Sequence, residues 1–301
     1  MPFARAFTCA LVLTLCTCSL RAQSKPQRLT LTFTTIDVPG ASLTNAAAIN
    51  NNGDIVGWYS PPGTTFSHGF LLSGGSFTFF DYPGGYTTLA TGVNDAQVVV
   101  GYSYVTGESV NGFTYQGGAF NTIQIAGYPD TYAEGIDKAG DIVGGYGFGS
   151  ANGFEQSGTK FRVVTPPGIQ GTVAANAINS HGQIVGWSFD TSHTGFLFYN
   201  GKYYTLNVPN SLNYTLSLGI NDNGIVVGWY LGCTPTCTEH GFALMKGKYL
   251  SFDYPGAMGT YASGINNAGQ IVGSYTFDQQ TFHGFVTSPV TSADFGASNK
   301  Q

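Results

Sequence analysis

Few side chains in this sequence are suited to acid–base chemistry, since charged residues make up only 9% of its 301 residues. Among the carboxylates, Glu134 with Asp130 or Glu108 is the best candidate for a catalytic pair. Glycosidases need two carboxyl groups roughly 5–9.5 Å apart. These residues would therefore suit a secreted carbohydrate-active enzyme, a glycoside hydrolase or a lyase.

Three histidines, each in a His-Gly-Phe triplet, are the candidates for metal binding. His68, His240 and His283 occupy the same position of a repeated unit, on a strand that we expect to lie about 10 Å outside the innermost strand. They cannot converge there, so we predict packed or hydrogen-bonded strand residues and no metal site. The sequence contains no serine elbow, Walker loop or His-Glu-x-x-His helix, and we expect neither a cofactor nor a nucleotide site.

Two cysteines lie close together in the segment Gly232-Cys233-Thr234-Pro235-Thr236-Cys237. In an exported chain, two such thiols are expected to form a disulfide that closes a loop tip. A redox or metal-binding pair is the alternative, but the expected mature chain offers no further cysteine and no suitably spaced histidine to complete a metal site.

The N-terminus has the pattern of an export signal. Arg5 precedes an apolar stretch from Phe7 to Leu20, which is too short for a membrane span, and cleavage is expected after Ala22. Lipoprotein processing at Cys18 is the alternative. Either route places the protein outside the cytoplasm, in the periplasm or the extracellular space, with no membrane span in the mature chain. The net charge of −5 gives no basic patch for nucleic acid.

These residues must be positioned by a repeat that runs along nearly the whole chain. The segment Ile49-Asn50-Asn51-Asn52-Gly53-Asp54-Ile55-Val56-Gly57 recurs at spacings of 44, 43, 42, 42 and 45 residues. Its later copies begin at Val93, Ile136, Ile178, Ile220 and Ile265. A period of about 40–45 residues with short strands is typical of propeller blades.

Two further motifs follow in each unit. One is a Gly-Phe pair, at Gly69-Phe70, Gly112-Phe113, Gly153-Phe154, Gly195-Phe196, Gly241-Phe242 and Gly284-Phe285. The other is a strand that ends in a turn of the type Asp-x-Pro-Gly, complete at Asp37, Asp81 and Asp253, where we expect the aspartate to cap the turn. Degenerate copies are Gly127-Tyr128-Pro129-Asp130, Thr165-Pro166-Pro167-Gly168 and Asn207-Val208-Pro209-Asn210.

Each unit is predicted to form four strands, named a to d; in the first unit they span about 44–50, 54–60, 67–73 and 76–82. Asn50 suits an Asx-turn and Gly53 a left-handed position between strands a and b. In the second unit Gln97 replaces this glycine, so its turn must differ or hold a strained residue. The valines that recur in each unit, such as Val56, and the recurring phenylalanines are expected to pack between neighbouring units.

The chain ends predict a closed ring. A lone d-type strand, Leu29–Asp37, precedes the first complete unit, and the last unit ends after its strand c. Pairing these would remove two exposed sheet edges. We therefore predict an all-β, six-bladed β-propeller over residues 29–290, with four-stranded blades, the last of them closed by the N-terminal strand. A signal peptide over residues 1–22 would precede it and a flexible tail over residues 291–301 would follow.

The sequence resembles the HAF-repeat family of bacterial extracellular proteins over about residues 29–290. The resemblance rests on the Ile-Asn-x-x-Gly-x-Ile/Val-Val-Gly turn and on a His-x-Phe triplet. The triplet has Gly where the family name implies Ala, and Asn or Thr replaces its His in three units. The resemblance implies export, and it brings no established activity and no catalytic residue.

Function is expected on the face that carries the d–a and b–c loops, because loops held by a rigid scaffold commonly carry binding sites. Glu134 lies on a strand a and is expected to face the central channel. The candidate ligand-binding residues are Tyr86, Tyr132, Tyr214, Tyr261, Glu134, Asp190 and Glu239. Exposed tyrosines suit stacking on sugars, although they would equally fill gaps between blades.

The sequence therefore favours a secreted, non-enzymatic propeller that binds a glycan or a cell-surface protein, and we expect a monomer. The alternatives are the carbohydrate-active enzyme with its carboxylate pair near the channel, and a purely structural envelope protein.

Overall fold

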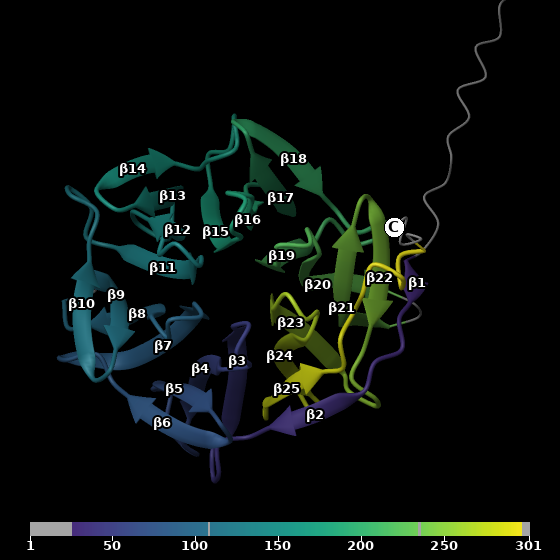
Figure 1. Ribbon diagram of the computed structural model, residues 1–301, viewed down its shortest axis with the longest axis horizontal. Helices are drawn as coiled ribbons and strands as arrows, with labels where there is room; N and C mark the ends of the chain where they lie inside the picture. Colours follow the sequence, from purple (N-terminus) through teal and green to yellow (C-terminus); the bar gives the residue numbers. More distant parts are fainter. Residues whose placement is uncertain (1–25, 108, 234–235, 297–301) are drawn as a thin grey trace, which may run out of the picture.

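The computed structural model describes residues 26–107, 109–233 and 236–296. Within these ranges the chain forms strands and no helix. The predicted signal peptide lies outside the described residues. Small sheets are arranged around a common axis in a propeller-like ring (Figure 1). No helix in the described part of the chain is long and apolar enough to cross a membrane.

Four of the sheets have four antiparallel strands each, in chain order from the axis outward. They are β3 (Leu43–Ile49), β4 (Ile55–Ser60), β5 (His68–Ser73) and β6 (Ser76–Phe80); β7 (Gly85–Val93), β8 (Val99–Val105), β9 (Ser109–Gln116) and β10 (Ala119–Ile123); β11 (Thr131–Ile136), β12 (Ile142–Tyr146), β13 (Asn152–Ser157) and β14 (Lys160–Val163); and β15 (Thr172–Ile178), β16 (Ile184–Phe189), β17 (His193–Tyr199) and β18 (Lys202–Leu206).

The remaining strands form one nine-stranded sheet. It comprises β1 (Gln27–Arg28), β2 (Phe33–Ile36), β19 (Thr215–Ile220), β20 (Val226–Cys233), β21 (Cys237–Met245), β22 (Lys248–Phe252), β23 (Gly259–Ile265), β24 (Ile271–Thr276) and β25 (His283–Thr287). The prediction of six separate four-stranded sheets is therefore wrong, because a parallel pair between Glu239 and Gly259 joins β21 to β23.

The N-terminal segment closes the ring as predicted, with one difference. Strand β2 pairs antiparallel with β25, from Phe33 opposite Thr287 to Ile36 opposite Gly284. The predicted strand from residue 29 is shorter, because the preceding β1 pairs in parallel with β22 and covers its edge. The N-terminal segment thus adds strands at two places in the nine-stranded sheet.

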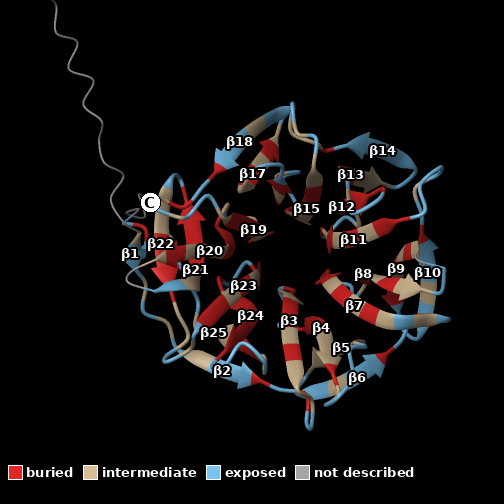
Figure 2. Ribbon diagram, turned by 180° about the vertical axis from the view of Figure 1, so that it is seen from behind, coloured by how far each residue is buried: buried red, intermediate tan, exposed pale blue. Residues whose placement is uncertain are grey.

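Six hydrophobic clusters in the described chain each join two consecutive units of the sequence repeat. In each, a valine of one unit joins the core of the next; Val56, for example, packs with Phe113 of the following unit. The six valines of this kind are Val56, Val100, Val143, Val185, Val227 and Val272, as predicted. Burial is therefore greatest on the inner strands, and the outer strands β6, β10, β14 and β18 are mostly exposed (Figure 2).

The glycine of each Ile-Val-Gly segment is required by the close approach of two neighbours. A Cβ atom on Gly57 would overlap the carbonyl oxygen of Asn45 and would lie 2.9 Å from the ring of Phe70. Gly57 and Phe70 are opposite each other in the register of β4 and β5. The recurring glycine and the recurring phenylalanine are thus two halves of one packing contact.

The turns at the a–b links follow the predicted chemistry. Gly53 has φ 84°, and Gln97, which replaces this glycine in the second unit, adopts φ 58°. Gln97 is held there by hydrogen bonds from its amide to Asp54 Oδ2 (3.1 Å) and Ser73 Oγ (3.3 Å). The prediction of a strained residue at this position is confirmed.

Two predicted boundaries need correction. The degenerate turn assigned to residues 127–130 lies three residues earlier: Ile125 N–H donates to the hydroxyl of Thr131, as Tyr82 N–H donates to that of Thr88. At the other end, Phe295 is only 8% exposed and packs in the cluster around Val290. The packed part of the chain therefore extends beyond the predicted boundary at residue 290.

Candidate functional site

The d–a and b–c connections lie together on one face of the ring. Backbone hydrogen bonds link the b–c loop of one unit to the d–a side of the next, as from His193 N–H to Asn213 O (3.1 Å) and from Thr44 N–H to Phe282 O (2.8 Å). This loop face is where the sequence placed the candidate binding residues.

A pocket with aromatic walls lies on the loop face, at the meeting point of three units. Its volume is about 320 Å³. Its lining residues come from strands β3, β4, β19, β20, β23 and β24 and from the loop before β25; they are Leu43, Asn45, Trp58, Leu218, Trp229, Tyr261, Ser263, Ser274 and Phe282. We call it the aromatic pocket.

The aromatic pocket lies where a small residue takes the place of a tryptophan of the repeat. The residue after Ile-Val-Gly or its equivalent is tryptophan in three units, at Trp58, Trp187 and Trp229. In the unit formed by β23–β25 it is Ser274, whose small side chain leaves space between Trp58 and Trp229. The Asn45 amide donates to Ser274 Oγ (3.1 Å), and Asn45 Oδ1 is buried without a partner. The pocket therefore combines aromatic faces with a free hydrogen-bond acceptor.

One of the predicted residues lines this pocket, and two others, Tyr214 and Glu239, lie next to residues of its wall. Tyr261 lines it, with its ring centroid 5.3 Å from that of Trp229. Tyr214 stacks on the other side of Trp229, also at 5.3 Å. Burial and then the nearby carboxylate of Glu239 raise the pKa of Tyr261 to about 12, so its phenol stays protonated, and its hydroxyl donates to Gln279 Oε1 (3.5 Å).

The aromatic contacts continue beyond the pocket through His193. This imidazole lies 3.9 Å from Tyr214 and 4.4 Å from Phe189, measured between ring centroids. Burial lowers the pKa of His193, so the ring packs as a neutral group. Asp190, by contrast, is exposed in the loop after β16 and does not line the aromatic pocket.

The other predicted tyrosines form a separate group over β7, β8 and β11. Tyr86, 47% exposed, contacts Phe66 at 5.8 Å and Tyr104 at 6.2 Å. Tyr132 packs edge-on against Tyr102 at 5.1 Å. Burial raises the pKa of Tyr132 to about 12. The structure therefore divides the predicted tyrosines into two groups.

Glu134 lies in the axial channel, as expected from its strand. It lines a chamber of about 80 Å³, and burial raises its pKa from 4.5 to about 8. Asp130 does not line this chamber; it is buried, and its Oδ1 accepts from Val110 N–H (3.1 Å). Glu108 lies outside the described residues. Among the described residues, no second carboxylate lines the chamber, so the proposed pair with Asp130 is not formed there.

The three triplet histidines pair with the turn aspartates of their own units. Their Nδ1 atoms lie 2.8 Å from Asp81, 2.8 Å from Asp253 and 2.9 Å from Asp37; the pairs are His68–Asp81, His240–Asp253 and His283–Asp37. The histidines are hydrogen-bonded strand residues as predicted, and the described part of the chain holds no cluster that could bind a metal. The prediction for the aspartates was incomplete, because their carboxylates bind the histidines.

The a–b turns on the opposite face are linked into a ring by asparagine side chains. Asn50 Oδ1 accepts from the N–H groups of Asn52 and Asp54, and its Nδ2 donates to the carbonyl of Asn94 in the next unit (3.0 Å). Equivalent links run from Asn94, Asn179, Asn221 and Asn266. Asp137, the one aspartate in this series, makes the turn bonds but not the link to the next unit.

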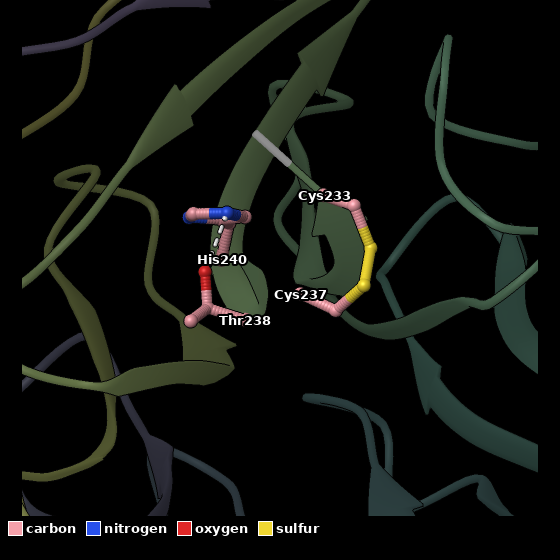
Figure 3. Close-up of a disulfide and its surroundings, with 4 residues drawn as sticks. All are labelled: Cys233, Cys237, Thr238 and His240. Carbon is pink, nitrogen blue, oxygen red and sulfur yellow. Dashed lines mark hydrogen bonds between the residues drawn. A yellow bond between two sulfur atoms is a disulfide. The ribbon is translucent and has the colours of Figure 1, made fainter. Parts of the chain in front are cut away.

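Cys233 and Cys237 form the predicted disulfide, at the end of the β20–β21 hairpin (Figure 3). Farther along β21, His240 Nε2 lies 3.1 Å from Thr238 Oγ1 (Figure 3). The cysteines are opposite each other in the register of the two strands. The disulfide therefore cross-links the two strands of this hairpin at its end.

Comparison with known proteins supports the fold. Neither the protein-family models nor the curated proteins include a match. Among solved structures, AofleA from Arthrobotrys oligospora is 12% identical, with 85% of this chain and 86% of that chain covered and a TM-score of 0.56. A putative gluconolactonase is 11% identical, with 87% and 94% covered and a TM-score of 0.51. At these identities the likeness shows a shared propeller-like fold.

Proposed function

We propose that this protein is a six-bladed propeller that binds a glycan in the aromatic pocket of its loop face. In this proposal the nine-stranded sheet is two blades, β19–β22 and β23–β25 with β2, because only the pair Glu239–Gly259 joins them. The six hydrophobic clusters between consecutive units support this count.

The aromatic pocket is the observation that carries the proposal. Its volume of about 320 Å³ is at the lower end of the range for small-molecule sites. The apolar face of a sugar can stack on the rings of Trp58, Trp229 and Tyr261. The polar atoms of these side chains can also take part in hydrogen bonds with the sugar. Asn45 Oδ1, buried without a partner, would accept a hydrogen bond from a sugar hydroxyl.

Binding is favoured over hydrolysis because the carboxylates do not meet. Glu134 lines the channel chamber, whereas Asp130 is engaged by a backbone amide elsewhere. Glycoside hydrolysis requires two carboxyl groups on opposite sides of one bond. Within the described chain, the arrangement around Glu134 does not provide this.

A glycan array with the mature protein, followed by calorimetry on the strongest hits, tests the proposal. Trp229→Ala removes a pocket wall and should weaken binding by about 5- to 150-fold, since aromatic stacking contacts of the kind measured for nucleobases are worth about 1–3 kcal/mol. Trp187→Ala is the matched control, because Trp187 occupies the same repeat position but does not line the pocket. We expect one site per chain. Equal loss in both variants, or no glycan bound at all, would refute the assignment.

Export and kinship with the HAF-repeat proteins also remain proposals. They are supported by the apolar segment before Ala22 and by the repeated turn. Mass spectrometry of the protein recovered from periplasm and culture medium tests the first: a mature chain that begins at Gln23 is expected, and an intact N-terminus would contradict it. A lipid on Cys18 would instead establish the lipoprotein route.

A further inference from the structure

The six inner strands each contain a β-bulge at the same place. The register of β11 with β12 shifts between Ala133 and Gly135, so the intervening Glu134 is the bulge residue. Bulges re-aim side chains, and here all six bulge residues line the axial chamber. The six are Ala47, Thr91, Glu134, Asn176, Leu218 and Ser263.

Glu134 is the only titratable side chain among the residues that line the chamber. None of the ion pairs in the described part of the chain involves it. A carboxylate surrounded by protein atoms is costly without a partner, and its pKa is raised accordingly. A ligand that brings a positive charge would remove this cost.

A second group in the chamber also lacks a partner. Asn176, the bulge residue of the next blade, has its Oδ1 buried with no hydrogen-bond donor. Ser263 adds a hydroxyl oxygen to the same wall. The chamber thus presents a carboxyl group that a bound cation would ionise and an amide oxygen that needs a donor.

The chamber adjoins the aromatic pocket. Leu218 and Ser263 line both cavities. A ring seated between Trp58 and Trp229 therefore lies next to two residues of the chamber wall, on the side from which a short substituent would extend toward Glu134.

We propose that the ligand of the aromatic pocket carries a primary amine that enters the axial chamber and binds Glu134 and Asn176, which identifies the ligand class as an amino sugar. This inference rests on the proposed glycan-binding function and adds the chemical class of the glycan. An ammonium group has three N–H donors and one positive charge, which match the carboxylate, the amide oxygen and a third oxygen such as that of Ser263.

An amine fits these groups better than a bound metal ion does. Calcium takes six to eight oxygen ligands, commonly several carboxylates. The described lining of the chamber offers one carboxylate. N-acetylation of the same sugar removes the charge and two of the donors, so an amine and its acetylated form are matched probes.

Calorimetry with oligomers of glucosamine and of N-acetylglucosamine tests the inference at neutral pH. The wild type should bind the glucosamine oligomer at least about tenfold more tightly, the effect of one charge-assisted hydrogen bond. Glu134→Gln should abolish this preference and leave the affinity for the acetylated oligomer within about twofold, because a lost charge pair affects only the cationic probe. Asp190→Asn, which removes an exposed carboxylate that lines neither cavity, should retain the preference.

Several results would overturn the inference. They are equal binding of the two oligomers by the wild type, a preference that survives in Glu134→Gln, and no binding of either oligomer. Neutral glycans that bind through Trp229 without any preference for amines would leave the proposed function standing. Stabilisation of the wild type, but not of Glu134→Gln, by calcium or ammonium chloride and not by glucosamine would identify a free-cation site instead.

Discussion

Replacing Glu134 by glutamine should stabilise the protein at alkaline pH and leave its stability in acid almost unchanged. Burial raises the pKa of Glu134 from 4.5 to about 8, so the folded protein keeps this proton well above the pH at which the unfolded chain loses it. Between these two values the folded state binds more protons than the unfolded state. Wild-type stability therefore falls as pH rises through this window, and it changes little further above it.

The size of the effect follows from the width of the window. A pKa difference of this size corresponds to at most about 5 kcal/mol, at about 1.4 kcal/mol per unit. Water reaching the partly exposed side chain lowers this figure, so we expect Glu134→Gln to gain about 2–5 kcal/mol over the wild type at alkaline pH.

Urea unfolding at about pH 5, 7 and 9 measures this gain as the difference in unfolding free energy between variant and wild type. The difference should be small at the lowest pH and should grow with pH. Tyr102, Tyr104 and Tyr132 surround the carboxylate, but they titrate above this range. Asp190→Asn, which removes an exposed carboxylate, is the control and should show no such trend. A difference for Glu134→Gln that is constant across pH would refute the reasoning.

Three further variants test the framework of the blades. Asp137→Asn supplies the missing amide donor toward the Asn179 carbonyl and should stabilise by about 1 kcal/mol in thermal unfolding at neutral pH; a loss of stability would contradict the ring of links. Asp253→Asn should cost about 1–3 kcal/mol above pH 4, with the cost fading in acid: burial opposes the charge, but the contact with His240 outweighs it and lowers the pKa, so this stability is lost as pH falls. A pH-independent cost would argue against the ion pair. Gly228→Ala places a methyl group against the backbone of β19 and should destabilise by at least about 2 kcal/mol in urea unfolding, whereas a neutral result would mean that the strands can separate there.

Local features of the fold could be predicted because short-range chemistry determines them. The left-handed turn at Gln97 follows from its place in a turn that glycine occupies elsewhere. The closure by β2 follows from the unmatched strands at the two chain ends. The pairs between triplet histidines and turn aspartates were also accessible, because the units that keep His68, His240 or His283 are the units that keep the aspartate.

The aromatic pocket could not be predicted, because it depends on contacts between units distant in sequence. Trp58 and Trp229 are 171 positions apart and become neighbours of one cavity only when the ring closes. The signal available in the sequence was the serine at position 274, where four of the other five units have a tryptophan or a tyrosine. The join at Glu239 and Gly259 was equally hidden, because it depends on how the β21 strand approaches β23.

The departures from the repeat make one sector of this ring different from the others. A symmetric propeller would present the same surface between every pair of blades. The symmetry of this ring is incomplete, because the aspartate–histidine pairs occur in three units and the asparagine links run from five. Ser274 opens space in one blade, and Glu134 places one charge among six bulge residues. Both changes affect cavities that share Leu218 and Ser263, which is the arrangement that the proposed binding of one amino sugar requires. The recurring residues therefore hold the blades together, whereas the exceptions determine what the ring can bind.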